Sequence, residues 1–140
     1  MPNDDVKLAV VNCLFVVPLD ELEIDEISKI VNIVSECQNI GAGKTELVLS
    51  TVYWICFKMV NDDSKDDQSA AIIFQRKFGE QMMNEALSIL SRNLTRVSPS
   101  PEDDQQKYIL SLSILNFIKV SYHAPIMRAH MLSGDKSLFK

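Results

Sequence analysis

The chain has 140 residues, with 14 Lys and Arg against 19 Asp and Glu, which gives a formal net charge of −5. Hydrophobic residues make up 46% and charged residues 24%, a balance that is typical of one folded domain and excludes a disordered chain. The acidic charge argues against nucleic acid as a partner, because a binder of phosphates needs a dense basic surface to displace their counterions.

Six helical segments are predicted along the chain, and no stretch alternates strictly enough between apolar and polar residues to indicate a strand. They cover residues 4–17, 22 or 25 to 37, 44–60, 69–96, 102–122 and 125–132. Prolines, glycines and acidic runs separate them, with linkers near 61–68 and 97–103. We therefore expect an all-α fold in which residues 1–140 form a single domain.

The third predicted helix, residues 44–60, is apolar nearly all round, which is typical of a helix packed between neighbours on most sides. We expect this helix to be central. Its narrow polar stripe contains Ser50, Thr51, Trp54 and Lys58, so Trp54 is expected where solvent or a ligand lies. Tryptophan is enriched among residues that dominate binding energies, which makes Trp54 the main candidate for partner contact. The alternative is that a flanking part of the protein buries the indole.

The later helices extend this candidate surface. Gly79 leaves open whether the fourth helix is continuous, because glycine weakens a helix interior. The fifth helix has an apolar side and a more polar stripe that contains Ser113, Asn116 and Lys119. The predicted partner-binding residues are Ser50, Trp54, Lys58, Asn116 and Lys119.

The segment Gly41-Ala42-Gly43-Lys44-Thr45 resembles the end of a phosphate-binding P-loop. Such a loop lies between a strand and a helix, and its backbone N–H groups, lysine and Ser or Thr hold phosphate and Mg²⁺. Here Gln38 stands where the first glycine belongs, and residues of helical period precede the segment. A glycine joint before a helix is the favoured interpretation, and a degenerate P-loop that binds nucleotide is an alternative function.

Ser98 and Ser100 each precede a proline, and acidic residues follow them. The pattern makes both serines candidates for phosphorylation by a proline-directed kinase, which would place phosphate near the N-terminus of the next helix. A proline stop and helix capping explain the same residues without modification.

No group of residues in the sequence indicates catalysis, a cofactor or a metal. Cys13, Cys37 and Cys56 lack the spacing of zinc ligands, and the acidic N-terminus does not resemble a signal peptide, so we expect reduced and mostly buried thiols. Pro125 separates His123 from His130, and the paired aspartates lie in charged runs instead of coupled, buried settings. We therefore expect an intracellular protein, cytoplasmic or nuclear, that is not an enzyme and holds no cofactor or metal.

The last part of the chain shows an order of elements seen in helical repeats. Residues 114–118 belong to one predicted helix, Pro125 opens a short one, and after Gly134 residues 136–139 read as the start of another. This order resembles the junction between armadillo repeats, and residues 4–60 form a second candidate unit. The resemblance to armadillo/HEAT-like helical repeats implies an α-solenoid segment with a curved surface that binds other proteins, including neighbouring repeats.

The expected function is that of a non-enzymatic scaffold or adaptor that binds other proteins through a helical-repeat surface. A compact helical bundle that regulates a partner by binding one of its helices is a further alternative. No membrane partner is expected, because the longest apolar-rich stretch, residues 47–60, is shorter than the roughly 20 residues that span a bilayer.

Overall fold

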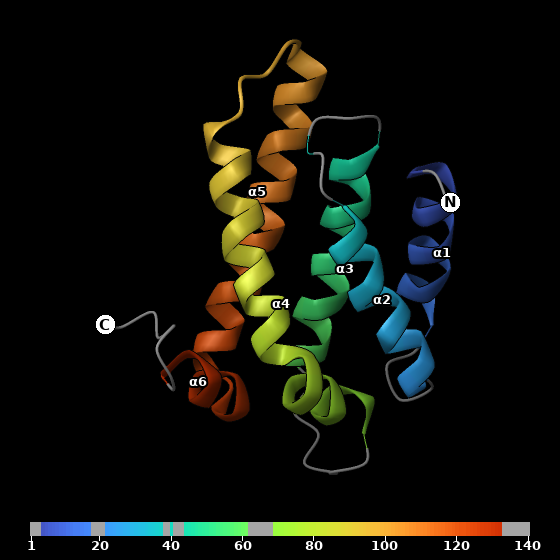
Figure 1. Cartoon of the computed structure of the whole chain (residues 1–140), viewed down its shortest axis with the longest axis vertical. Helices are drawn as coiled ribbons and strands as arrows, with labels where there is room; N and C mark the ends of the chain where they lie inside the picture. Colours follow the sequence, from blue (N-terminus) through green and yellow to red (C-terminus); the bar gives the residue numbers. More distant parts are fainter. Residues whose placement is uncertain (1–3, 18–21, 38–39, 41–43, 62–68, 133–140) are drawn as a thin grey trace.

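The computed structural model describes residues 4–17, 22–37, 40, 44–61 and 69–132 of the chain. These residues form six helices and no strand (Figure 1). In chain order the helices are α1 (Asp4–Val16), α2 (Ile24–Glu36), α3 (Thr45–Val60), α4 (Ala70–Thr95), α5 (Pro101–His123) and α6 (Pro125–Leu132). The all-α fold and the number of helices predicted from the sequence are therefore confirmed for this part of the chain.

Side-chain caps set the starts of two long helices. Ser69 accepts a hydrogen bond from the backbone N–H of Ile72 at the start of α4, and Ser100 accepts one from that of Asp103 at the start of α5. With Ser100 as cap and Pro101 in the first turn, α5 begins before the predicted end of the 97–103 linker. The other predicted linker, apart from Asn61, falls outside the described residues.

The six helices form two rows. In one row α1 packs against α3 and α3 against α5, and in the other α2 packs against α4 and α4 against α6. α3 and α5 make the most extensive helix contact in the described chain. Figure 1 shows α1 at one side of the molecule and α4, α5 and α6 towards the other. This order makes α3 central, as its apolar circumference predicts, and places α5 at the end of its row.

The core lies around α3, where two large rings meet. Tyr53 of α3 and Phe117 of α5 are both fully buried, with ring centroids 5.5 Å apart. The Tyr53 hydroxyl is buried as well and has no hydrogen-bond partner among the described residues. Burial raises the pKa of Tyr53 well above its ordinary value, because the phenolate would lose its hydration. The hydroxyl is therefore a polar group that the core does not satisfy.

Replacing Tyr53 with Phe removes this hydroxyl and keeps the ring against Phe117. A buried polar group without a partner destabilises a fold by about 1–3 kcal/mol, so we expect Tyr53→Phe to raise the free energy of unfolding by about 1 kcal/mol in urea titrations. Phe117→Leu is the contrasting control and should lower it, because the ring contact is lost. A Tyr53→Phe variant less stable than the wild type would contradict the assignment.

Gly79 lies in α4 on the side that packs against α6. A Cβ atom built on Gly79 would lie 2.5 Å from Sδ of Met127 and 3.2 Å from Cδ2 of His130. Met127 is fully buried, and Nε2 of His130 lies 2.9 Å from the carbonyl oxygen of Gln75. The two-helix alternative for residues 69–96 is wrong, because α4 is continuous from Ala70 to Thr95. The missing side chain of Gly79 lets α6 approach α4.

Gly79→Ala tests this close approach. Alanine favours a helix interior by about 1 kcal/mol, but overpacking a buried contact costs about 1–3 kcal/mol. We expect Gly79→Ala to lower the free energy of unfolding by about 1 kcal/mol. In a Met127→Ala background, Gly79→Ala should instead raise the free energy of unfolding, because the clash with the Met127 side chain is gone and alanine still favours the helix more than glycine does. Chemical denaturation of the wild type, the two single variants and the double variant measures both differences in stability. A Gly79→Ala change that is also destabilising in the Met127→Ala background would count against the contact.

Candidate functional site

In the structure, Ser50 of the predicted α3 stripe is buried, and Thr51, Trp54 and Lys58 are half-buried. Ser50 is buried, and its hydroxyl donates to the backbone oxygen of Glu46 at 2.7 Å. Trp54 is half-buried, with its ring edge-on to Phe57 at 5.6 Å. Lys58 reaches α1, where Nζ donates to the backbone oxygen of Phe15 at 3.2 Å and lies 4.5 Å from the ring centroid of that residue. Ser50 and Lys58 thus both make contacts within the fold.

The α5 candidates lie elsewhere. Asn116 is half-buried and Lys119 is exposed, whereas Ser113, also expected on the polar stripe, is fully buried and donates to the backbone oxygen of Ile109. α1 and α5 pack on α3 at different sides of the molecule (Figure 1). Lys58 and Lys119 are therefore not gathered into one surface, and partner binding by the five predicted residues stays a prediction.

The structure shows a surface that the sequence analysis missed, on the side of α5 that faces away from the core. Its large apolar members are Tyr108, Leu112, Leu115 and Tyr122, which are 67%, 41%, 51% and 47% exposed. Seven exposed residues follow one another at intervals of four and three along this side: Pro101, Gln105, Tyr108, Leu112, Leu115, Lys119 and Tyr122. We call these seven residues the α5 outer row.

The α5 outer row was hidden in the sequence because α5 is apolar on two sides. Leu110, Ile114 and Phe117, all fully buried, form the core side, and their spacing accounts for a helix on its own. In the sequence, Leu112 and Leu115 are not distinguished from these core residues. They stand out only when the four- and three-residue intervals of the α5 outer row are traced through them. That spacing is the pattern of helices that pack along one another.

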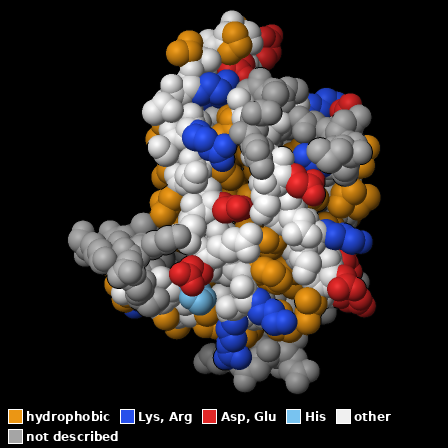
Figure 2. All heavy atoms as spheres, viewed as in Figure 1, with side chains coloured by type: hydrophobic (Ala, Val, Ile, Leu, Met, Phe, Trp, Pro, Cys, Tyr) orange, Lys and Arg blue, Asp and Glu red, His pale blue; other side chains and the backbone are white. Residues whose placement is uncertain are grey.

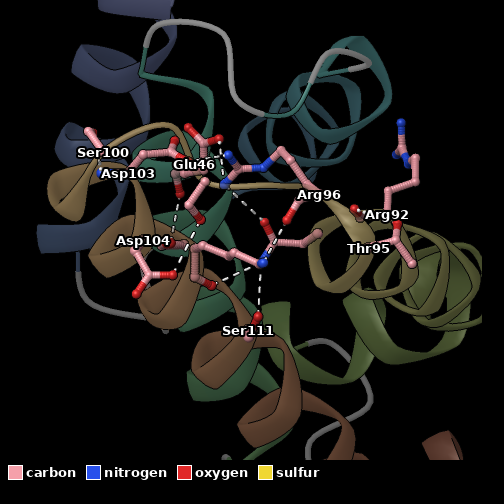
Figure 3. A network of polar contacts seen from close by, with 12 residues as sticks. Glu46, Arg92, Thr95, Arg96, Ser100, Asp103, Asp104 and Ser111 are labelled. Carbon is pink, nitrogen blue, oxygen red and sulfur yellow. Dashed lines mark hydrogen bonds and ion pairs between the residues drawn. The ribbon is translucent and has the colours of Figure 1, made fainter.

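A polar cluster joins the adjacent ends of α3, α4 and α5 (Figure 3). Asn93 of α4 is fully buried, and its Nδ2 donates to the backbone oxygen of Lys107 and to Oγ of Ser111, each at 2.9 Å. Nζ of Lys107 donates to the backbone oxygen of Arg96 at 2.6 Å. These bonds fix the end of α4 to the first half of α5.

The same cluster contains an ion pair with a buried carboxylate. Nη2 of Arg96 lies 3.4 Å from Oε1 of Glu46, and Nη1 of Arg96 donates to Oδ2 of Asp103. Glu46 is buried in the first turn of α3, and little of Arg96 or Asp103 reaches solvent. Arg96 therefore neutralises one carboxylate from α3 and one from α5.

Removing Arg96 should be costly, because Glu46 would keep a buried charge without a counterion. We expect Arg96→Met to lower the free energy of unfolding by about 3 kcal/mol at neutral pH, and Glu46→Gln in that background to restore most of the loss. The matched control is Lys44→Met, which breaks an exposed pair with Asp5 at 2.6 Å and should cost less than about 1 kcal/mol. Equal losses for Arg96→Met and Lys44→Met would contradict the role of the buried pair.

Ser98 and Ser100 both make contacts at this end of the molecule. Oγ of Ser98 lies 3.3 Å from Oδ1 of Asp104, and Oγ of Ser100 caps α5. Both residues are half-buried. The capping interpretation is thus seen for Ser100, and phosphorylation of either serine stays a prediction.

The segment with P-loop character lies partly outside the described residues, which exclude 41–43. Lys44 pairs with Asp5 of α1, and Thr45 is buried in the first turn of α3. The element before the segment is the helix α2, where a P-loop requires a strand. These observations do not favour the nucleotide-binding alternative.

The reactive side chains are dispersed. Cys37 and Cys56 are buried, Cys13 is exposed, and burial raises the pKa of the Cys56 thiol, so this thiol stays protonated. Burial also raises the pKa of Glu85, against the opposing effect of a hydrogen bond from Ser35. Within the described residues no three His, Cys, Asp or Glu side chains could together hold a metal ion.

A shallow hollow of about 270 Å³ lies between α1 and α2, lined by Val6, Val10 and Ile33 among others. Nζ of Lys7 lies 4.0 Å from Oε2 of Glu36 beside it. Its lining mixes these aliphatic side chains with two lysines, a glutamate and an asparagine, a combination that indicates no specific ligand.

The face seen in Figure 2 carries Lys, Arg, Asp and Glu side chains interspersed with hydrophobic ones. None of the helices in the described ranges is both long and apolar enough to cross a membrane. Comparison of the chain with protein-family models, curated proteins and solved structures gave no match.

Proposed function

We propose that the chain is a non-enzymatic protein-interaction module that binds a helix of its partner through the α5 outer row. The observation that carries the proposal is the exposure of Tyr108, Leu112, Leu115 and Tyr122 along one helix face. Aromatic and aliphatic groups at this density are uncommon on a surface that has no partner, since burying each favours association.

The spacing of the α5 outer row supports a helix as the bound element. Intervals of four and three residues keep the side chains on one narrow stripe along a helix. From Pro101 to Tyr122 the stripe is about 32 Å long at 1.5 Å per residue. A partner helix with apolar residues at matching intervals can place them between those of α5, with a carboxylate or an aromatic ring opposite Lys119.

The order of the helices supports an armadillo/HEAT-like architecture for this module. In such solenoids each helix packs on the next helix of its own row, as α1, α3 and α5 do here and as α2, α4 and α6 do in the other row. The last helix of a row offers its free side to whatever stacks next. α5 holds that position in its row, and this supports a scaffold or adaptor role for the module.

A photoreactive amino acid tests the surface. We expect benzoylphenylalanine at position 112, introduced into the full chain in cells, to form covalent adducts with a helical segment of a protein, identified by mass spectrometry. Position 94 is the matched control, because Leu94 is 59% exposed but lies on α4. Addition of Leu115→Glu should abolish the adducts at 112. Equal adducts at 94 and 112, or none at 112, would contradict the proposal.

A further inference from the structure

We propose that the helix bound by the α5 outer row is α5 of a second copy of this chain, aligned antiparallel around a two-fold axis. This inference rests on the proposed function and adds the identity of the partner. It follows from the order of residues within the row, from the charges at the two ends of α5, and from what a parallel alignment would place together.

The α5 outer row is complementary to itself when one copy is reversed. With the axis between Ser113 and Ile114, Leu112 of each copy lies opposite Leu115 of the other. One step further out, Tyr108 lies opposite Lys119 of the second copy. The central layers are then aliphatic, and each outer layer places an ammonium group on an aromatic ring, which is a favourable contact.

The charges at the ends of α5 also fit this alignment. Exposed Glu102 and Asp104 lie at its start, and exposed Lys119 and His123 lie towards its end. Reversal of one copy brings the acidic first turn beside the basic end of the other. It also places the positive N-terminal end of each helix dipole beside the negative C-terminal end of its partner.

A parallel alignment of the same faces lacks these contacts. Each residue would meet its own copy, so Lys119 would lie against Lys119 and the acidic first turns would lie together. Like charges at such positions weaken helix pairing. The row therefore distinguishes between the two orientations, and two substitutions at Tyr108 can read out which one forms.

Sedimentation velocity of the purified chain tests the dimer. We expect a dimer at about 100 µM, because a single helix pair is a small interface and such interfaces are weak. Leu112→Glu should raise the dissociation constant at least about 100-fold, since two carboxylates enter the apolar centre. Leu94→Glu, an equal change at an exposed leucine outside the row, should leave it unchanged. A monomeric wild-type chain at this concentration would overturn the proposal.

The orientation is tested at Tyr108, which is 67% exposed, so neither variant removes a core contact. In the antiparallel dimer, Tyr108→Glu lies opposite Lys119 and should preserve dimerisation, whereas Tyr108→Lys should weaken it about tenfold or more by repulsion. Equal weakening by both substitutions would contradict the antiparallel alignment. Circular dichroism of each variant confirms that the monomer remains folded.

The two proposals fail in different ways. If the wild-type chain is monomeric but position 112 still forms adducts with another protein in cells, the second copy is wrong and the interaction surface stands. If the chain is monomeric and position 112 forms no adduct, both are wrong. Adducts between two copies, together with loss of the dimer in Leu112→Glu, support both.

Discussion

The structure depends on the burial of α3, whose apolar side chains extend around most of its circumference. A helix of this kind is stable in water only when neighbours cover it on several sides. α1 and α5 cover it within its own row, and α4 packs on it from the other row. The ring contact between Tyr53 and Phe117 lies in the largest of these interfaces. This requirement accounts for the positions of α1, α4 and α5 against α3.

The number and limits of the helices could be read from the sequence because their signals are local. Prolines, capping serines and apolar periodicity act within a few residues, so the start of α5 at Pro101 was missed by one position only. Why a glycine stands inside α4 could not be read from the sequence, because the space beside Gly79 is occupied by Met127, which lies far along the chain. The sequence shows a glycine that weakens a helix, but it does not show that the Met127 side chain of α6 occupies the space where a side chain at position 79 would lie.

The binding surface was harder to predict for a related reason. On α3, polar residues were assigned to solvent, yet Ser50 bonds to the backbone of its own helix and Lys58 bonds to α1. On α5, the sequence indicated an apolar side and a polar stripe, and it did not single out Leu112 and Leu115, which the structure leaves exposed. Lys119 is the one predicted partner-binding residue that also belongs to the α5 outer row. When a helix has apolar residues on two sides, tertiary packing decides which side is buried. The order of apolar and polar residues along the helix does not reveal that choice.

The ion pairs of Arg96 link the stability of α3, α4 and α5. In helical-repeat proteins each unit contacts only its neighbours, so one end can open while the other stays folded. Here a carboxylate at the start of α3 is neutralised by a side chain at the end of α4, which also holds the start of α5. If the junction between α4 and α5 opens, the buried Glu46 loses its counterion and α3 is destabilised with it. The ion pairs of Arg96 therefore couple the stability of α3 to that of the junction between α4 and α5.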